Sequence, residues 1–232
     1  TLNTLRFFRN APQGPAAAGM TGHKGFFYHF LDMKSGARFR DCELSTIDTA
    51  LFLAGALHAQ SFFDGADAAE VQIRTLADEI YARVDWRWAQ NCAPAISHGW
   101  HPETGFIRWD WTGHNESMIA YLLSLGSPTF AVEPAAWDAW TSTYDKNWGT
   151  DGGLPYLRFP PLFGHQFTHV WVDFRGLTDK YMRGRGIDYF ENSRRATLAQ
   201  VRDRGTRQPL GNVPSAFLKA FDIALPRSKF LS

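Results

Sequence analysis

The sequence is poor in the residues that mark several large protein classes. Only two of its 232 residues are cysteines, Cys42 and Cys92, and they lack the close spacing of a metal-binding motif. The net charge is +1, so no excess of one sign favours nucleic acid or anionic lipid as a partner. No apolar run approaches the roughly 20 residues needed to cross a membrane. The composition indicates a globular chain with no nucleic-acid partner and no membrane-spanning segment.

Several catalytic motifs are also missing. The chain has no Gly-x-Ser-x-Gly elbow, no Walker loop and no dinucleotide fingerprint, so serine hydrolases, NTPases and Rossmann enzymes lose support. It begins at Thr1, without a methionine or a signal peptide. We therefore expect a processed or excised piece of a longer protein.

Aromatic residues are abundant instead, with nine tryptophans and nineteen phenylalanines against 20% charged residues. Such richness fits either thick helical packing or an aromatic-lined cleft. The stretch from Trp100 to Glu116 combines three tryptophans, an arginine and three acidic residues, and it leads into an apolar segment. Aromatic faces pack against sugar C–H surfaces, and carboxylates bind hydroxyls and move protons at a glycosidic oxygen. This stretch indicates carbohydrate chemistry.

Hydrophobic periodicity predicts a mainly helical chain. We expect the end of a helix over 1–10 and further helices over 45–63, 68–84, 116–125, from Pro134, over 163–174 and over 186–205. Residues 25–39 are typical of a β-hairpin with its turn near 34–36. With no linker visible, 1–232 is expected to form a single domain of packed helical hairpins, in which 206–232 is a divergent tail.

The first candidate site is the acidic segment with Asp41, Glu43 and Asp48. Ser45 and Asp48 have the spacing of a capping box, in which both side chains satisfy free N–H groups at a helix start. One cap does not require all three carboxylates, so convergence on a ligand remains open.

Glu116 is the second candidate. At the start of a helix it is either a residue stabilised by the helix dipole, by roughly 0.3–1 kcal/mol, or a catalytic acid. The dipole lowers a carboxyl pKa, whereas a general acid needs its pKa raised by burial or by a neighbouring carboxylate.

Two further clusters have plain structural explanations. His165, His169 and Asp173 fall four residues apart, like a metal-ligand ladder, but Gln166 stands where zinc helices commonly carry glutamate. We therefore favour polar residues of a cleft or core there, and no metal. Glu191 lies three and four residues before Arg194 and Arg195, a spacing typical of a surface ion pair.

Six ordered blocks between about residues 4 and 200 resemble the bacterial glucoamylase-like domain. That group includes the endo-β-1,2-glucanases of glycoside hydrolase family 144, and related domains occur in cyclic β-1,2-glucan synthases. The blocks are Gly25-Phe-Phe-Tyr-His-Phe-Leu-Asp, Glu43-Leu-Ser-Thr-Ile-Asp-Thr-Ala-Leu, Trp111-Thr-Gly-His-Asn-Glu, Leu125-Gly-Ser-Pro, Leu162-Phe-Gly-His-Gln and Ile187-Asp-Tyr-Phe-Glu-Asn-Ser-Arg-Arg-Ala-Thr.

The resemblance implies an all-α fold, an (α/α)6 barrel with a glucan cleft at one end, and a bacterial periplasmic or cell-envelope location. It aligns Glu116 with the family's general acid, and Asp41 and Asp48 with acidic positions of the catalytic centre. Ser45 stands where some glucanases carry aspartate, and Asp48 where they carry glutamate. Such domains continue past Gln200 through further helices, so we expect a barrel that is incomplete at its C-terminus.

We therefore expect a glycoside hydrolase that makes endo cuts in a β-1,2-glucan by general acid/base catalysis, without a cofactor. Its partner would be an oligo- or polysaccharide. The alternatives are a non-catalytic glucan-binding module and a structural helical domain of a larger glucan synthase. The residues expected to bind substrate are Glu43, Trp109, Trp111, Trp148, His165, Gln166 and Glu191.

Overall fold

The computed structural model describes residues 1–207, and the predicted tail beyond them, 208–232, lies outside this range. The chain divides into two compact units, which are described separately below. The first contains residues 1–112 and 117–142, and the second contains 113–116 and the residues from 143 onward. Helices dominate both, and each contains one small antiparallel sheet.

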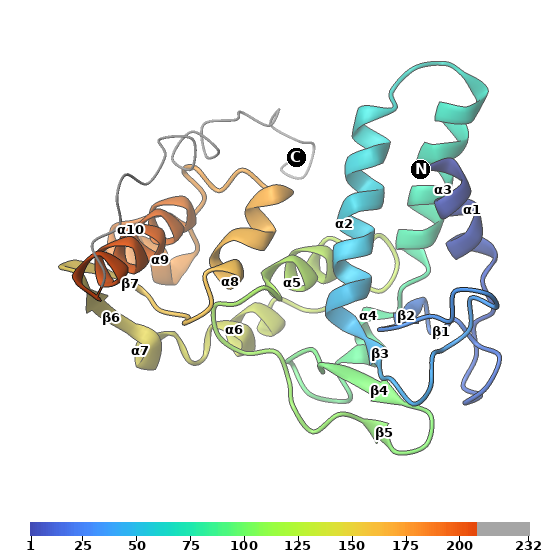
Figure 1. Cartoon of the computed structure of the whole chain (residues 1–232), viewed down its shortest axis with the longest axis horizontal. Helices are drawn as coiled ribbons and strands as arrows, with labels where there is room; N and C mark the ends of the chain where they lie inside the picture. Colours follow the sequence, from blue (N-terminus) through green and yellow to red (C-terminus); the bar gives the residue numbers. More distant parts are fainter. Residues whose placement is uncertain (208–232) are drawn as a thin grey trace. The chain divides into compact units, whose positions relative to one another are not determined.

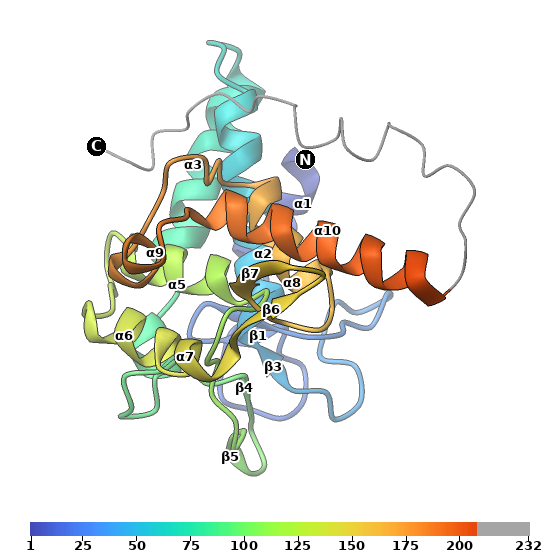
Figure 2. The same cartoon turned by 90° about the vertical axis from the view of Figure 1, so that its left-hand side faces the viewer.

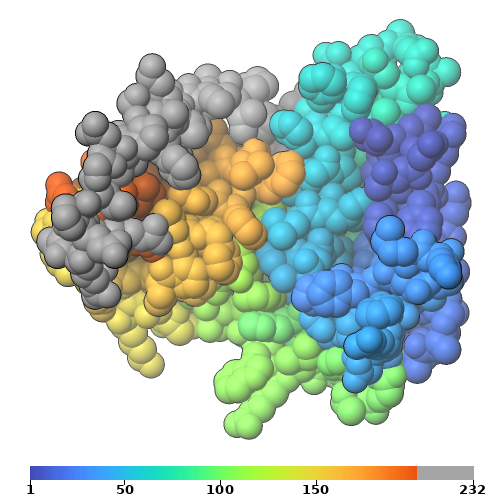
Figure 3. Space-filling view, viewed as in Figure 1, coloured from blue at the N-terminus to red at the C-terminus, as the bar shows by residue number. Residues whose placement is uncertain are grey.

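Three helices of the first unit lie side by side (Figure 1). Helix α1 (Leu2–Asn10) packs against α3 (Ala68–Ala82), and α3 packs against α2 (Thr46–Phe62). The space-filling view shows the blue residues of α1 directly against the α2–α3 pair (Figure 3). Three shorter helices complete the unit: α4 (Trp86–Ala89), α5 (Met118–Leu125) and α6 (Ala135–Thr141). Helix α2 also packs against α5, which makes it the central helix of this unit.

Local sequence signals explain the α2–α3 hairpin. The Ser45 hydroxyl accepts a hydrogen bond from the backbone N–H of Asp48, and the Asp67 carboxylate accepts one from Ala69 N–H at the start of α3. Both caps satisfy N–H groups that the first turn of a helix leaves free. Leu53 near the middle of α2 and Ile80 in the last turn of α3 are both fully buried. The predicted helices over 45–63 and 68–84 are thus confirmed.

A five-stranded antiparallel sheet lies beside these helices. Its strands follow the chain order: β1 (Gly22–His23), β2 (Phe26–Tyr28), β3 (Leu44–Ser45), β4 (Gly99–His101) and β5 (Gly105–Phe106). The β1–β2 turn has positive φ at both Lys24 and Gly25, as a two-residue hairpin turn requires. The predicted turn near 34–36 also exists, because Asp32 N–H donates to Ala37 C=O across it. The predicted hairpin over 25–39 is thus formed only in part: its first arm, β2, pairs with β1 and β3, and its second arm adds one isolated bridge between Leu31 and Arg38.

The second unit is built around its last helix. It contains α7 (Tyr144–Asn147), a hairpin of β6 (Trp148–Asp151) and β7 (Leu154–Leu157), α8 (Phe163–Gln166), the 3-10 helix η1 (Phe167–Val170), α9 (Lys180–Arg185) and α10 (Tyr189–Arg207). Helix α10 packs against β7 and α8, which Figure 2 shows from the side. The amide of Asn192 on α10 accepts from Leu157 N–H at 2.7 Å. The Asn192 side chain thereby gives an edge N–H of β7 a hydrogen-bond acceptor, which a third strand would otherwise have to supply.

Most of the predicted helices are present, and one prediction is wrong. The expected helix over 163–174 is broken into α8 and η1. Within this segment Phe174 is buried, whereas Phe167 and Val170 are 40% and 54% exposed. The helix expected from Glu116 begins at Met118. Across residues 1–207, no helix has the length and apolar character of a membrane span.

Candidate active site

A cluster of two carboxylates, one imidazole and one hydroxyl forms at the start of α2. Its members are His29, Glu43, Ser45 and Asp48, and we call it the histidine–carboxylate cluster. Pairing of β2 with β3 places the first two side by side, since His29 N–H donates to Glu43 C=O just beyond the strand pair. His29 Nδ1 lies 2.7 Å from Glu43 Oε1, and His29 Nε2 lies 3.6 Å from Asp48 Oδ2. The imidazole thus bridges two of the three acidic residues of this segment.

Ser45 anchors Asp48 within the cluster. Its hydroxyl donates to Asp48 Oδ2 at 2.5 Å and accepts from Asp48 N–H at 3.2 Å. Only the Ser45 half of the expected capping box is formed, because the Asp48 carboxylate accepts from the Ser45 hydroxyl and not from a backbone N–H; the same carboxylate also faces His29. The Asp48 side chain remains 44% exposed. Asp41 is exposed on the loop before β3. The segment combines a helix cap with a solvent-accessible carboxylate.

The charge of Glu43 is stabilised where it stands. Partial burial raises its pKa, but hydrogen bonds from its own backbone N–H and from His29 outweigh burial, so the pKa lies below the usual glutamate value. A carboxylate accepts hydrogen bonds and donates none, so the hydrogen between the two groups resides on His29 Nδ1.

The tryptophan-rich stretch is held mainly by packing. Trp111 donates from Nε1 to Thr46 Oγ1 at 3.0 Å, and its ring stacks on His98 with centroids 3.7 Å apart. Tyr121 fixes the same stretch, because its hydroxyl donates to Trp111 C=O and accepts from Ile96 N–H. Since His98 covers one face of Trp111, a sugar could stack only on the other.

Trp109 differs from Trp111 in being open to solvent. It is 64% exposed, and the guanidinium of Arg108 lies 5.4 Å from its ring centroid. Of the two tryptophans of this stretch expected to bind sugar, Trp109 presents the more accessible surface.

Glu116 belongs to the second unit, where Gly113 and His114 shortly before it are tightly held. Gly113 has φ +82°, and a Cβ there would lie 2.7 Å from Thr143 Oγ1. His114 is buried, with its ring stacked on Tyr189 and 4.9 Å from the ring of His165. Glycine and a buried ring at these positions fix the path of the chain immediately before Glu116.

Burial raises the pKa of the Glu116 carboxyl above its ordinary value, against the lowering effect of its own backbone N–H. The side chain is half-buried, and within residues 1–207 its Oε2 has no hydrogen-bond partner. Of the two alternatives left open for Glu116, burial and not the helix dipole sets the direction of the pKa, and α5 begins only at Met118. The unpartnered Oε2 is itself buried, and a carboxyl in such surroundings can hold a proton, as general acids must.

The other residues expected to bind substrate lie in the second unit, in varied surroundings. His165 is 1% exposed, with Nε2 3.2 Å from Phe159 C=O, so in this structure it is a packing residue. Trp148 is partly exposed, and Gln166 is partly exposed on α8. The guanidinium of Arg185 lies 4.8 Å from the Trp148 ring centroid. Their roles toward a sugar stay predictions.

Glu191 forms the ion pair expected from its spacing. Its carboxylate accepts from Arg194 at 2.6 Å and from Arg195 at 2.7 Å. These hydrogen bonds, from Arg194 foremost, hold the pKa of Glu191 below the usual value. The structure accounts for Glu191 as an ion-pair residue, and substrate binding by it stays a prediction.

The apparent metal ladder is not formed. His165 lies on α8, but His169 lies on the 3-10 helix η1, where three residues per turn replace 3.6 and residues four apart diverge. His169 Nε2 lies 2.9 Å from Ser193 Oγ, and Asp173 pairs with Arg175. In the described part of the chain, no group of three or more His, Cys, Asp or Glu residues is arranged to hold a metal ion.

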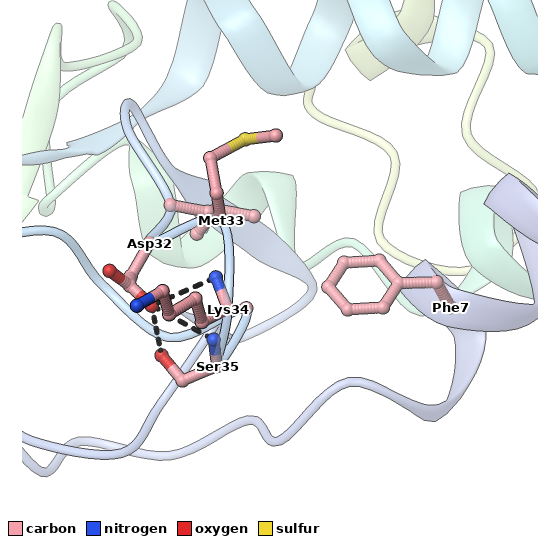
Figure 4. A pocket seen from close by; sticks show the side chains of 7 residues that line it. Phe7, Asp32, Met33, Lys34 and Ser35 are labelled. Atoms are coloured by element: carbon pink, nitrogen blue, oxygen red, sulfur yellow. Dashed lines mark hydrogen bonds between the residues drawn. The ribbon is translucent and has the colours of Figure 1, made fainter.

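A separate surface pocket of about 260 Å³ lies in the first unit, between Phe7 of α1 and the turn at 31–36 (Figure 4). The Asp32 carboxylate there accepts from Lys34 N–H, from Ser35 N–H and from the Ser35 hydroxyl. These bonds close the turn on itself, and none of the predicted site residues lines the pocket. It is a feature of the turn.

Two residues of the candidate site were missed by sequence reasoning. His29 was present in a recognised block but carried no motif of its own, and only β2–β3 pairing brings it to Glu43. Tyr121 looked like one apolar residue among others on its helix. No local signal points to either residue.

Part of the chain matches a known protein family. Residues 108–209 match the family model Glycoamylase, described as "Putative glucoamylase". The chain is 25% identical over 211 residues to the exo β-1,2-glucooligosaccharide sophorohydrolase of Parabacteroides distasonis. The chain is a relative of the glucoamylase-like proteins. The aligned region covers 78% of this chain and 28% of that relative, so the chain spans less than a third of its length.

Solved structures of this group have a similar fold. The structure of a putative glucoamylase from Bacteroides uniformis superposes with a TM-score of 0.73 at 22% identity, covering 85% of this chain and 48% of that one. The endo-β-1,2-glucanase from Chitinophaga pinensis, in complex with sophorotriose and glucose, gives 0.69 at 20% identity, covering 84% and 47%. The chain thus has the glucoamylase-like fold over about half the length of these proteins.

Proposed function

We propose that the chain acts as a glycoside hydrolase on a β-glucan and makes endo cuts at β-1,2-glucosidic linkages. The observation that carries this proposal is Glu116, a half-buried carboxyl with a raised pKa and a free oxygen. The names of the relatives support the substrate class, since one is a β-1,2-glucooligosaccharide hydrolase and another a β-1,2-glucanase. We further propose that the helices form part of an (α/α)6 barrel, which the helical hairpin α2–α3 supports.

The proposed chemistry needs one acid and one base. Glu116 gives its proton to the glycosidic oxygen as the bond from that oxygen to C1 breaks. Water adds to C1, and its proton passes to a base, for which the family resemblance suggests Asp48. Asp48 is the preferred base because Ser45 anchors one of its oxygens while the side chain stays accessible. Asp41, exposed before β3, is the second candidate for that role.

A competing function is that of a glucan-binding module without catalysis. The observation that favours it is Trp109, which is 64% exposed and whose ring is suited to stacking on a sugar. A binding module would hold β-1,2-glucan saturably and leave it intact.

The test compares wild-type protein with Glu116→Gln on linear β-1,2-glucan, with β-1,3-glucan as the linkage control. We expect new reducing ends with the wild type and a fall in kcat of roughly 10²- to 10⁴-fold in Glu116→Gln. The matched control is Glu133→Gln, an exposed glutamate of the first unit, which should retain wild-type activity. Products of many lengths indicate endo action, whereas a single disaccharide indicates exo action. Saturable binding without cleavage by the wild type would favour the module and overturn the enzyme.

A further inference from the structure

We infer that His29 is a positioning residue for the proposed hydrolysis, holding Asp48 in place through a bridge that Glu43 anchors. The inference rests on the proposed function and assigns a role to a residue outside the acidic segment itself. It also changes the role of Glu43, from a sugar contact to the residue that orients His29.

The bridge begins with His29, whose ring is held at one edge and on one face and whose backbone is held by strand pairing. Glu43 Oε1 lies 2.7 Å from Nδ1, and the backbone N–H of His29 donates to Glu43 C=O at 2.9 Å. The ring of Phe30 stacks on the imidazole with centroids 4.1 Å apart and planes within 11°. These contacts leave the imidazole little freedom to rotate, because both its edge and its face are engaged.

The fixed ring then presents Nε2 to Asp48. That nitrogen lies 3.6 Å from Asp48 Oδ2, the same oxygen to which the Ser45 hydroxyl donates at 2.5 Å. Because Nδ1 donates to Glu43, this contact is an ion pair, too long for a hydrogen bond, that forms when the ring carries both protons. Both contacts fall on one oxygen, and in the described part of the chain no hydrogen bond is formed by Oδ1. A carboxylate held by one oxygen offers the other, in a defined direction, to a water molecule.

The solvent exposure of the three side chains distinguishes this bridge from an ion pair that stabilises the fold. The side chains of His29, Glu43 and Asp48 are 37%, 29% and 44% exposed. Pairs this accessible contribute little to fold stability. If the bridge positions Asp48, its loss should change turnover while leaving the unfolding transition where it is.

The experiment measures kcat, KM and the unfolding midpoint on β-1,2-glucan for wild type, His29→Ala and His29→Gln. We expect kcat to fall roughly 10- to 100-fold in His29→Ala, with KM within about twofold and an unchanged midpoint. His29→Gln keeps an amide donor and should recover part of the loss, as should added imidazole with His29→Ala. The control is His58→Ala, an exposed histidine ten residues beyond Asp48 on α2, about 15 Å away along the helix.

A double variant tests the order of the bridge. If Glu43 acts through His29, adding Glu43→Gln to His29→Ala lowers kcat no further. An additional loss with a raised KM would make Glu43 a direct sugar contact and overturn its anchoring role.

The possible outcomes separate the inference from the proposed function. Cleavage by the wild type together with normal kcat in His29→Ala overturns the role of His29 and leaves the hydrolase standing. Equal losses in His29→Ala and His58→Ala also overturn it. Absence of cleavage by the wild type overturns the proposed function itself, and the role of His29 with it.

Discussion

Acidification should destabilise the second unit well above the pH at which most carboxylates titrate. The cause is His165, which is 1% exposed and whose pKa burial lowers from 6.5 to about 4. His114 is also buried, and burial holds its pKa well below the usual value. Burial likewise lowers the pKa of His169 to about 4, although part of that residue reaches the surface. For all three histidines, the lowered pKa means that protonation favours the unfolded state.

The sign follows from which state binds the proton. An unfolded histidine takes up a proton near pH 6.5, whereas folded His165 does so only near pH 4. Between these values the unfolded state holds more protons, so stability is complete above about pH 7 and falls as the pH drops through the window. For His165 alone the full effect is roughly 3 kcal/mol, of which roughly 2 kcal/mol is lost by pH 5.

Denaturant unfolding at pH 7.5, 6.5, 5.5 and 5.0 checks this prediction. Wild type should lose at least about 2 kcal/mol between the extremes. His165→Gln, which keeps a donor for the Phe159 carbonyl, should lose about 2 kcal/mol less over the same range. Identical pH dependence in wild type and His165→Gln would refute the assignment of the effect to His165.

Four further predictions concern the core, a turn, a buried hydroxyl and the proposed acid. Leu53→Ala removes a fully buried side chain of α2 and should cost about 2–5 kcal/mol in the free energy of unfolding, measured with urea. Gly25→Ala should lower the melting temperature, because φ is +87° and the new Cβ would lie 2.6 Å from the carbonyl of residue 83. Tyr121→Phe leaves two backbone groups without their partner, so urea unfolding should show a loss of about 1–3 kcal/mol. In a pH profile of kcat, the activity should fall with rising pH at a value above the ordinary glutamate pKa, because Glu116 must be protonated to act as the acid. If the residual activity of Glu116→Gln falls over the same pH range, the titrating group is a residue other than Glu116.

The elements predicted well from sequence are those specified by nearby residues. Ser45 caps α2 and Asp67 caps α3, and the apolar positions that follow recur at helical spacing. Each signal lies within one turn of the helix it starts, so the sequence displays it directly. The turn near 34–36 was found for the same reason, since Asp32 closes it with residues two and three positions away.

The elements missed depend on partners far along the chain. Strand β3 has two residues and exists because Leu44 pairs with Tyr28 on one side and with Trp100 on the other. No alternation can appear in so short a segment. The prediction of one helix over 163–174 failed for a different reason. The spacing of its aromatic residues suits a helix with a buried face, but Phe167 and Val170 are exposed. Periodicity cannot tell which face of a segment the rest of the fold will cover.

The same limit applies to the candidate site. Residue types and a family resemblance were enough to select Glu116 and Asp48, but they could not supply the surroundings that give each carboxyl its chemistry. Glu43, with two donors, keeps its charge, whereas Glu116, with a free oxygen and partial burial, favours the protonated form. Carboxyl groups whose surroundings push their pKa values apart are a basis for assigning acids and bases. The proton donor is therefore to be sought at Glu116 rather than in the acidic segment. Within that segment, the residue to vary first is His29, because it joins the charge-stabilised Glu43 to the accessible Asp48.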